Sequence, residues 1–421
     1  MKRSIAPLLA LFLLIENGFA QTTDAGASQS DQWRSYVEPL ASIGERVVPL
    51  MSDPADPQLR QELYRFLFSQ ISSGYMGRLY ADANHPDFWP FLNQAYNTFA
   101  PNPDASYYMT PIDGKGIYRI SGFRGTVPVA DFQISGGTLY PLGTGAPGDT
   151  YANYELGELK TVGKDGAFDV LLSGERPAGY KGNWWKLDPR ATNIIVRQFS
   201  YDWLREQDGR FAIERLDRAA IKPRPGAEEI DANLRQIPVW VETWTRASLR
   251  WLSNLRAKGL VNKVEVHDLN KSGGVSRQKY IEGLYELKDG EALIYETEMP
   301  QRCRYWNLQI TDALWSSIDW MNRQTSLNGH SARIDKDGRL RIVISGTDPG
   351  VPNWIDSAGY PSGALLGRWT ECSSAPTPTL TRVALEDLRK HLPTDTPVVT
   401  AAERDAAIRL RRKGAQLRRR W

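Results

Sequence analysis

The stretch that decides the fold lies in the second half of the chain, where residues 305–308 read YWNL, residues 339–345 read RLRIVIS and residues 348–356 read DPGVPNWID. The first two are short runs of apolar and aromatic residues, which are typical of strands. Pro349, Gly350 and Pro352 then break the chain into a rigid loop. Short strands separated by Gly- and Pro-rich turns favour antiparallel sandwich layers over a parallel sheet with crossover helices.

The same strand pattern occurs over residues 117–122, 128–135, 168–172 and 193–201. Asp165-Gly166 predicts a hairpin over residues 155–172, and residues 335–338 predict a turn between strands at 332–334 and 340–345. Apolar residues at helical spacing predict helices within residues 32–80 and 228–258, and a short closing helix over 384–391. The predicted fold class is mainly β with helical additions (α+β): an antiparallel β-sandwich or jelly-roll-like core with an N-terminal helical region.

Length and composition are those of a globular protein, with 421 residues, 41% hydrophobic and 24% charged. Two cysteines and four histidines exclude a zinc finger, an iron–sulfur cluster of the ferredoxin type and a multi-disulfide scaffold. We therefore expect no metal and no cofactor. The chain is expected to divide into a signal peptide (1–20), a flexible leader (21–31), a helical region (32–105), a first β-rich segment (106–225), a connecting helix (226–262), a second β-rich segment with the DPGVPNW loop (263–392) and a basic tail (393–421).

The N-terminus has the layout of a cleaved secretory signal. Lys2 and Arg3 precede an apolar run over residues 5–15, and Gly18 and Ala20 are small residues at the −3 and −1 positions before Gln21. An apolar run of about 11 residues is too short for a bilayer core that needs roughly 20. We expect cleavage after Ala20 and a mature protein that is periplasmic or secreted.

An exported protein can hold its two cysteines as a disulfide. Cys303 and Cys372 both lie in or just after strand-like segments, and a bridge between them would stabilise the fold by roughly 4 kcal/mol. Two separate buried thiols are the alternative.

The C-terminal tail is strongly basic, with eight Lys or Arg side chains and one acidic residue over residues 404–421. An apolar edge formed by Ala407, Ile408, Leu410, Ala415 and Leu417 predicts a helix. The helix would be solvated or docked on the protein itself, or it would contact an anionic membrane surface. Nucleic acid is not expected as a partner of an exported protein.

Several motifs occur in a recognisable order: Arg197-Gln198 with Asp202-Trp203, then YWNL, TSLN at 325–328, DPGVPNWID and Arg368. Together they resemble the bacterial family called domain of unknown function 1214, a relative of 1254. The resemblance covers roughly residues 105–420, and its most specific part is the DPGVPNW loop. It implies a β-sandwich, jelly-roll-like core and no particular activity.

Polar residues among apolar strands are the candidates for a site, because a buried charge needs a partner. Arg197 could pair with Asp202, Asp319, Asp348 or Asp356 to fix a loop, or Arg197, Arg323 or Arg368 could clamp a ligand oxyanion. We predict that six residues converge: Arg197, Asp202, Asn353, Trp354, Asp356 and Arg368. Trp306 and Trp354 are candidates for stacking on a ligand, and Arg197, Asp202 and Asp356 are candidates for catalysis.

These features predict an exported protein that binds or processes a small-molecule or saccharide-like ligand in a β-sandwich pocket rimmed by residues 348–356. An enzyme of this composition would be a hydrolase or lyase using Asp/Glu acid–base chemistry, since histidines are few. The alternative is a non-catalytic structural or interaction module of the cell envelope.

Overall fold

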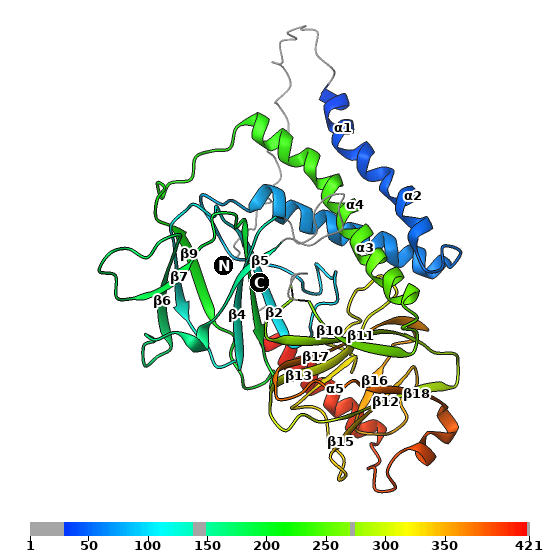
Figure 1. The fold of residues 1–421 in the computed structure, drawn as a ribbon. Coiled ribbons are helices and arrows are strands. Elements are labelled where there is room, and N and C mark those ends of the chain that lie inside the picture. Colours follow the sequence, from blue (N-terminus) through cyan, green and yellow to red (C-terminus); the bar gives the residue numbers. More distant parts are fainter. Residues whose placement is uncertain (1–28, 138–148, 270–273, 419–421) are drawn as a thin grey trace, which may run out of the picture.

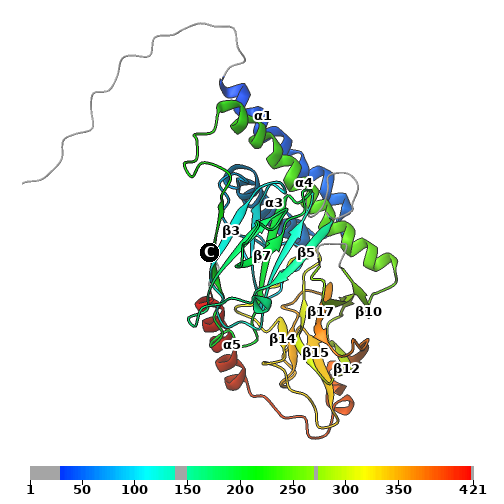
Figure 2. The ribbon, with the colours of Figure 1, turned by 60° about the vertical axis from the view of Figure 1, so that its left-hand side comes forward.

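Four β-sheets and a layer of helices make up the computed structural model, which describes residues 29–137, 149–269 and 274–418. The sheets form two β-sandwiches, one from each β-rich half of the chain (Figure 1). Helices α1 to α4 lie together on one side of the molecule (Figures 1 and 2). The signal peptide and most of the leader that the sequence predicts lie outside the described residues.

The first sandwich joins a five-stranded and a four-stranded sheet. The five-stranded sheet has the order β1 (Trp89–Pro90), β2 (Ala105–Pro111), β8 (Asn193–Phe199), β4 (Val129–Ser135) and β5 (Thr150–Glu155). The four-stranded sheet has the order β7 (Asn183–Lys186), β6 (Ala167–Ser173), β3 (Tyr118–Phe123) and β9 (Arg210–Arg215). Their facing sides share one core around Ile120, Phe132 and Val196. Every residue of β4 and β8 is buried, because other elements cover the second face of their sheet as well.

The second sandwich repeats this arrangement with different strands, in a five-stranded sheet (the third sheet) and a four-stranded sheet (the fourth sheet). Its five-stranded sheet has the order β10 (Lys263–Asp268), β11 (Gln278–Glu286), β17 (Ser362–Cys372), β13 (Cys303–Ile310) and β14 (Ser326–Asn328). Its four-stranded sheet has the order β16 (Trp354–Asp356), β15 (Arg339–Ser345), β12 (Glu291–Glu298) and β18 (Thr379–Ala384). Leu293, Leu308 and Ile342 lie in the shared core. Cys303 and Cys372 are opposite each other on β13 and β17 and are joined by a disulfide.

The long helix α4 (Ala227–Ala257) connects the two halves of the chain. Its first half packs on α3 (Pro57–Tyr75) and the π-helical turn Met76–Tyr80 that follows. Gly77 is required there, because a Cβ at this position would lie 2.9 Å from the indole of Trp240. The second half of α4 places Leu255 in a cluster with Tyr280 and Leu284 of β11. The helical layer therefore covers the outer face of the third sheet. The shorter helices α1 (Gln29–Ala41) and α2 (Ile43–Val47) complete it.

The predicted fold class is confirmed: the protein is α+β, with mostly antiparallel sheets and an N-terminal helical region. Within the described ranges none of the four sheets closes into a barrel. The hairpin predicted over residues 155–172 is wrong, because β5 pairs with β4 in one sheet and β6 pairs with β3 and β7 in the facing sheet. The turn at Asp165 does form, but the chain around it crosses from one sheet to the facing sheet. The crossing follows Leu156, which is buried in the core between the sheets.

The second predicted hairpin also fails, although its turn is present. The backbone N–H of Asp335 donates to Arg339 O, but residues 332–334 form no strand, and β15 pairs with β12 and β16 instead. The closing segment predicted over residues 384–391 is a 3₁₀-helix, Leu385–His391.

The basic tail forms α5 (Ala401–Leu417), which starts with a capping box in which Thr400 accepts from the Glu403 N–H and Glu403 accepts from the Thr400 N–H. Of its apolar edge, Ala415 packs in a cluster with Trp203, Trp320 and Met321, whereas Leu410 and Leu417 are 56% and 64% exposed. Most of the docking contacts come from arginines. Arg404, Arg411 and Arg418, seven residues apart and therefore on one face, each bind backbone or side-chain oxygens of the sandwiches. Self-docking, one of the predicted alternatives, is therefore what the structure contains.

Candidate functional site

Arg197 lies in the middle of β8 with its side chain buried. Its Nη1 donates a 2.9 Å hydrogen bond to Gln133 Oε1 and lies 3.8 Å from Asp131 Oδ2. Burial raises the pKa of Asp131 to about 6, an effect that the charge of Arg197 and hydrogen bonds from Asn153 oppose. Arg197 thus has a buried carboxyl beside it, as expected, but the partner is Asp131 of the neighbouring strand and not one of the four aspartates considered from the sequence.

Asp202 follows β8 and organises the turn after it. Its Oδ1 accepts a 3.0 Å hydrogen bond from the N–H of Leu204, and its Oδ2 lies 3.7 Å from Arg205 and 3.9 Å from His330. These contacts are those of a turn-forming aspartate.

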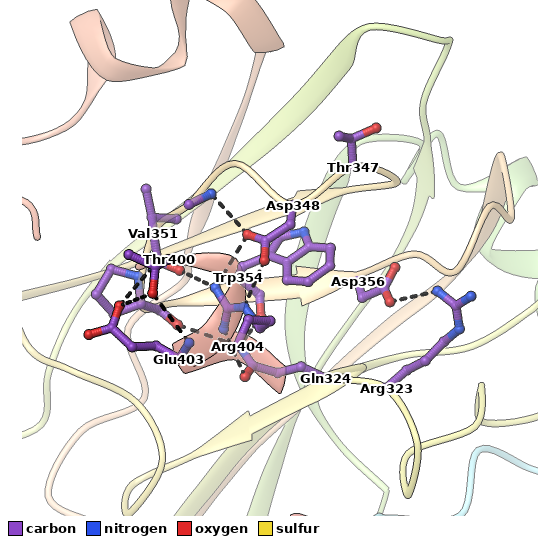
Figure 3. A network of polar contacts seen from close by, with 12 residues as sticks. Arg323, Gln324, Thr347, Asp348, Val351, Trp354, Asp356, Thr400, Glu403 and Arg404 are labelled. Atoms are coloured by element: carbon purple, nitrogen blue, oxygen red, sulfur yellow. Dashed lines mark hydrogen bonds and ion pairs between the residues drawn. The ribbon is translucent and has the colours of Figure 1, made fainter. Parts of the chain in front are cut away.

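The loop at residues 348–356 is held by its own side chains (Figure 3). Asn353 Nδ2 donates to the carbonyls of Arg333 and Arg341, and its Oδ1 accepts from the N–H of Arg333. Trp354 is buried in a core cluster, donates through Nε1 to Ser345 Oγ at 3.0 Å, and carries the guanidinium of Arg404 5.1 Å above its ring. Both side chains therefore fix the loop.

Asp356 accepts a 2.8 Å hydrogen bond from Arg323 Nη1 and another from the N–H of Ala358 (Figure 3). Asp348 binds Arg404 of α5, with Nε and Oδ2 2.9 Å apart. The cavity beside the loop, which Asn353 lines, has a volume of about 20 Å³, enough for a single water molecule.

The remaining two residues lie in the third sheet. Arg368 on β17 donates to Gln309 Oε1 at 2.8 Å and lies 5.9 Å from the ring of Tyr280. Trp306 is buried on β13, opposite Trp369.

These contacts do not bring the six residues into one cluster, so the predicted convergence is not observed. Arg197 belongs to the first sandwich, Arg368 to the third sheet, and Asn353, Trp354 and Asp356 to the edge of the fourth sheet. The physical reason is that these polar side chains find separate partners: Arg197 has Gln133 and Asp131, Arg368 has Gln309, and Asp356 has Arg323. A shared effect remains between two of them, since the charges of both Arg197 and Arg368 oppose the raised pKa of Tyr280.

A much larger cavity, of about 690 Å³, lies between α3 and the loops that follow β13 and β16. Its wall comes from α3, residues 94–97, residues 312–323 and residues 358–360. Of the lining residues, Arg65, Asn322 and Arg323 are exposed, whereas Asp312, Ser317 and Ile318 are buried. The polar members of the lining are Glu62, Arg65, Ser69, Gln94, Asn97, Asp312, Ser316, Ser317, Asp319, Asn322, Arg323 and Tyr360.

The ionisable groups of this cavity influence one another. The pKa of Asp312 is raised to about 7, chiefly by burial and in part by the charge of Glu62. Hydrogen bonds from the N–H groups of Ser316 and Leu314 and the charge of Arg65 act in the opposite direction. Burial also raises the pKa of Tyr360 to about 12, with Asp312 and Glu62 acting in the same direction. Carboxyl groups with such raised pKa values occur preferentially at functional sites, where they serve as acids or bases.

The walls of the cavity are interlocked. Asn97 Nδ2 donates to Ser317 O at 2.7 Å, and Asn97 Oδ1 accepts from the N–H of Ser317 at 2.9 Å. Trp315, within one wall, has φ +65°, and Ala358, in another, has φ +57°. Left-handed backbone at non-glycine residues costs of order 1–3 kcal/mol and is maintained at functional sites by the surrounding structure.

The described residues contain no group of three or more His, Cys, Asp or Glu side chains arranged to hold a metal ion. They also include no helix long and apolar enough to cross a membrane. Asp312 was not predicted as a site residue, because the candidates from the sequence were charged residues inside apolar strands. The available signal was an acid directly after the buried strand β13, followed by the serines of a tight turn.

Fold and site together define an α+β protein of two β-sandwiches with a polar cavity beside α3. Residues 288–365 match the model of the family described as "Protein of unknown function (DUF1214)". The matched family is the one that the motifs suggested, and the matched segment contains three of these motifs: YWNL, TSLN and DPGVPNWID. Asp312 and Tyr360 also lie within the matched segment, whereas Glu62 and Arg65 lie outside it.

Among solved structures, an uncharacterised protein from Burkholderia cenocepacia is similar over most of both chains. The two are 26% identical, with 85% of this chain and 98% of the other covered and a TM-score of 0.78. The VPA0106 protein from Vibrio parahaemolyticus is 12% identical over 83% of this chain and 99% of its own, with a TM-score of 0.41. A search of the curated proteins finds no match to the chain.

Proposed function

We propose that the protein is exported and binds a small, hydroxylated, saccharide-like molecule in the 690 Å³ cavity. The single observation that carries this proposal is the cavity itself, whose volume lies within the range of about 300–1,000 Å³ typical of ligand sites. Its carboxylates, amides, hydroxyls and guanidinium groups offer both donors and acceptors, which is what a molecule with several hydroxyl groups requires.

Charge favours a neutral ligand over a small anion. Arg65 is offset by Glu62 one turn away on the same helix face, and Arg323 is paired with Asp356. Asp319 uses its carboxylate on the N–H groups of Met321 and Asn322. An added carboxylate would therefore meet no unpaired positive cluster, whereas hydroxyl groups can donate to the acids and accept from Arg65.

Substitutions on one helix test the proposal. Ser69 lines the cavity and donates to Phe66 O, whereas Ser72 is exposed outside the cavity lining and donates to Phe68 O. Ser69→Trp should fill the cavity, and Ser72→Trp is the matched control with the same helix geometry. The measurement is thermal stabilisation and calorimetric binding with a panel of glucose, galactose, maltose, cellobiose and chitobiose.

We expect stabilisation by at least one sugar in the wild type and in Ser72→Trp, and its loss in Ser69→Trp. A ligand present at 100 times its Kd stabilises by about 2.7 kcal/mol, which is easily resolved. If no sugar binds the wild type, or if Ser69→Trp binds as well as Ser72→Trp, the proposal is rejected. The alternative, a non-catalytic structural or interaction module of the cell envelope, would then be preferred.

Export is tested separately. Lys2, Arg3 and the apolar run that follows support cleavage after Ala20. N-terminal sequencing of protein from an osmotic-shock fraction should begin at Gln21. A chain that begins at Met1 would contradict export by cleavage.

A further inference from the structure

Asp312 is a buried carboxyl with one oxygen committed to the fold. It is 4% exposed, and its Oδ1 accepts two hydrogen bonds of 2.9 Å from the N–H groups of Leu314 and Ser316. Within the described residues, both hydrogen bonds to the Asp312 side chain go to Oδ1. Oδ2 is therefore left for the cavity that Asp312 lines. One oxygen therefore holds the strained turn that contains Trp315, and the other is available to a ligand.

A second carboxyl, on α3, lines the same cavity. Glu62 is half-buried, nearer to solvent than Asp312, and its Oε1 accepts a 3.1 Å hydrogen bond from Gln58 Nε2. Two more ionisable groups line the cavity: Arg65, one turn further along the helix, and Tyr360, from the loop after β16. The charge of Arg65 acts on Asp312, and the charges of Asp312 and Glu62 act on Tyr360. Two carboxyl groups in unequal surroundings are the arrangement by which one site supplies both an acid and a base.

We propose that this cavity is a hydrolytic active site in which Asp312 is the general acid and Glu62 the general base for cleavage of a glycosidic C–O bond. The inference rests on the proposed binding of a saccharide-like ligand and names the reaction performed on it. Asp312 is placed as the acid because it is the buried group, which favours the protonated form. Glu62 is placed as the base because it is the more exposed of the two carboxyl groups, and solvent water reaches it more easily.

The step balances with water as the only co-reactant. The proton on Asp312 Oδ2 passes to the glycosidic oxygen, and the electron pair of the breaking C–O bond leaves with that oxygen as a hydroxyl group. A water molecule attacks the anomeric carbon and forms the new C–O bond, while its proton passes to the carboxylate of Glu62. Proton exchange with solvent then returns Asp312 to the acid form and Glu62 to the carboxylate.

Asp312→Asn is the decisive variant, because asparagine keeps the Oδ1 acceptor of the turn and removes only the acid. The probes are the 4-nitrophenyl glycosides of glucose, galactose, mannose and N-acetylglucosamine, with nitrophenol release as the readout. We expect the wild type to release nitrophenol from at least one of them. Asp312→Asn and Glu62→Gln should each lower kcat by about 10²–10⁴-fold with little change in binding. Asp165→Asn, an exposed aspartate that also accepts a backbone N–H, is the matched control and should keep full activity.

The pH profile separates an acid from a merely structural residue. Wild-type activity should fall as the pH rises through about 7, because the acid form of Asp312 is then lost. The residual activity of Asp312→Asn should lack this fall.

The outcomes distinguish the two proposals. If a sugar binds but the wild type cleaves none of the four glycosides, or if Asp312→Asn retains its kcat, hydrolysis by Asp312 is overturned and ligand binding stands. If no sugar or glycoside binds at all, both proposals fail. Binding that survives in Asp312→Asn together with lost turnover and a lost high-pH fall supports the active site.

Discussion

Trp354 provides the sharpest test of whether the DPGVPNW loop is structural. The indole is 7% exposed and packs in a cluster with Val343 and Val351. Trp354→Ala removes the whole ring, and core truncations of this size cost about 3–5 kcal/mol. It also removes the hydrogen bond to Ser345 and the contact with the Arg404 guanidinium, the latter worth about 0.5–2 kcal/mol.

Urea unfolding followed by far-ultraviolet circular dichroism should therefore show a loss of at least about 3 kcal/mol in unfolding free energy for Trp354→Ala. Trp33→Ala is the control, because Trp33 is 66% exposed and its removal should change stability by about 0.5 kcal/mol or less. Trp354→Phe should fall between them, since it keeps most of the packing and loses the N–H donor. A loss below about 1 kcal/mol for Trp354→Ala, with sugar binding abolished, would refute the structural interpretation and restore this residue as a pocket wall.

Three further predictions concern other parts of the molecule. The pKa of Asp312 in the folded protein lies above its ordinary value, so its carboxyl destabilises the fold once it is ionised. The unfolding free energy of the wild type should therefore fall by up to about 4 kcal/mol between pH 4 and 7 relative to that of Asp312→Asn. Equal pH dependence of the two proteins in urea titrations would contradict this. Thiol labelling of denatured, unreduced protein should find neither Cys303 nor Cys372 free, and two labelled cysteines per chain would exclude the bridge. Arg411→Ala removes bonds to Trp320 O and Ser326 Oγ, so limited proteolysis should release α5 faster than in the control Arg412→Ala, which loses a single exposed contact.

Several strands and helices could be predicted from the sequence because their signals are local. Turn residues and apolar runs placed β4, β8 and α4 within one or two residues of their observed ends. Strand pairing could not be predicted in the same way. The turn at Asp165 has hairpin chemistry, yet the strands on its two sides belong to facing sheets, because Leu156 anchors the chain in the core before the turn is reached. Which strands pair depends on long-range packing that a short window of sequence does not contain.

The docking of α5 shows a second limit of the same kind. The sequence predicted a helix with an apolar edge that is solvated, docked on the protein itself or in contact with a membrane surface, and it did not indicate which side chains would dock. Arg404, Arg411 and Arg418 face the protein and bind carboxylates and carbonyl groups contributed by both sandwiches. A spacing of seven residues was visible in the sequence, but the oxygen atoms that these arginines bind come from segments about 50 to 310 positions away.

Asp312 could not be picked out from the sequence, and the reason is physical. A charge inside an apolar strand is conspicuous, and it must also be neutralised wherever the strand is buried, so this signal selects residues with structural partners such as Arg197 and Arg368. A catalytic carboxyl needs the opposite: part of it must stay without a protein partner so that a ligand can meet it. Asp312 fulfils this condition by lying just beyond the strand, where the turn uses one oxygen and the cavity receives the other. In this fold the conspicuous charges hold the scaffold, and the proposed chemistry belongs to a residue at a strand end.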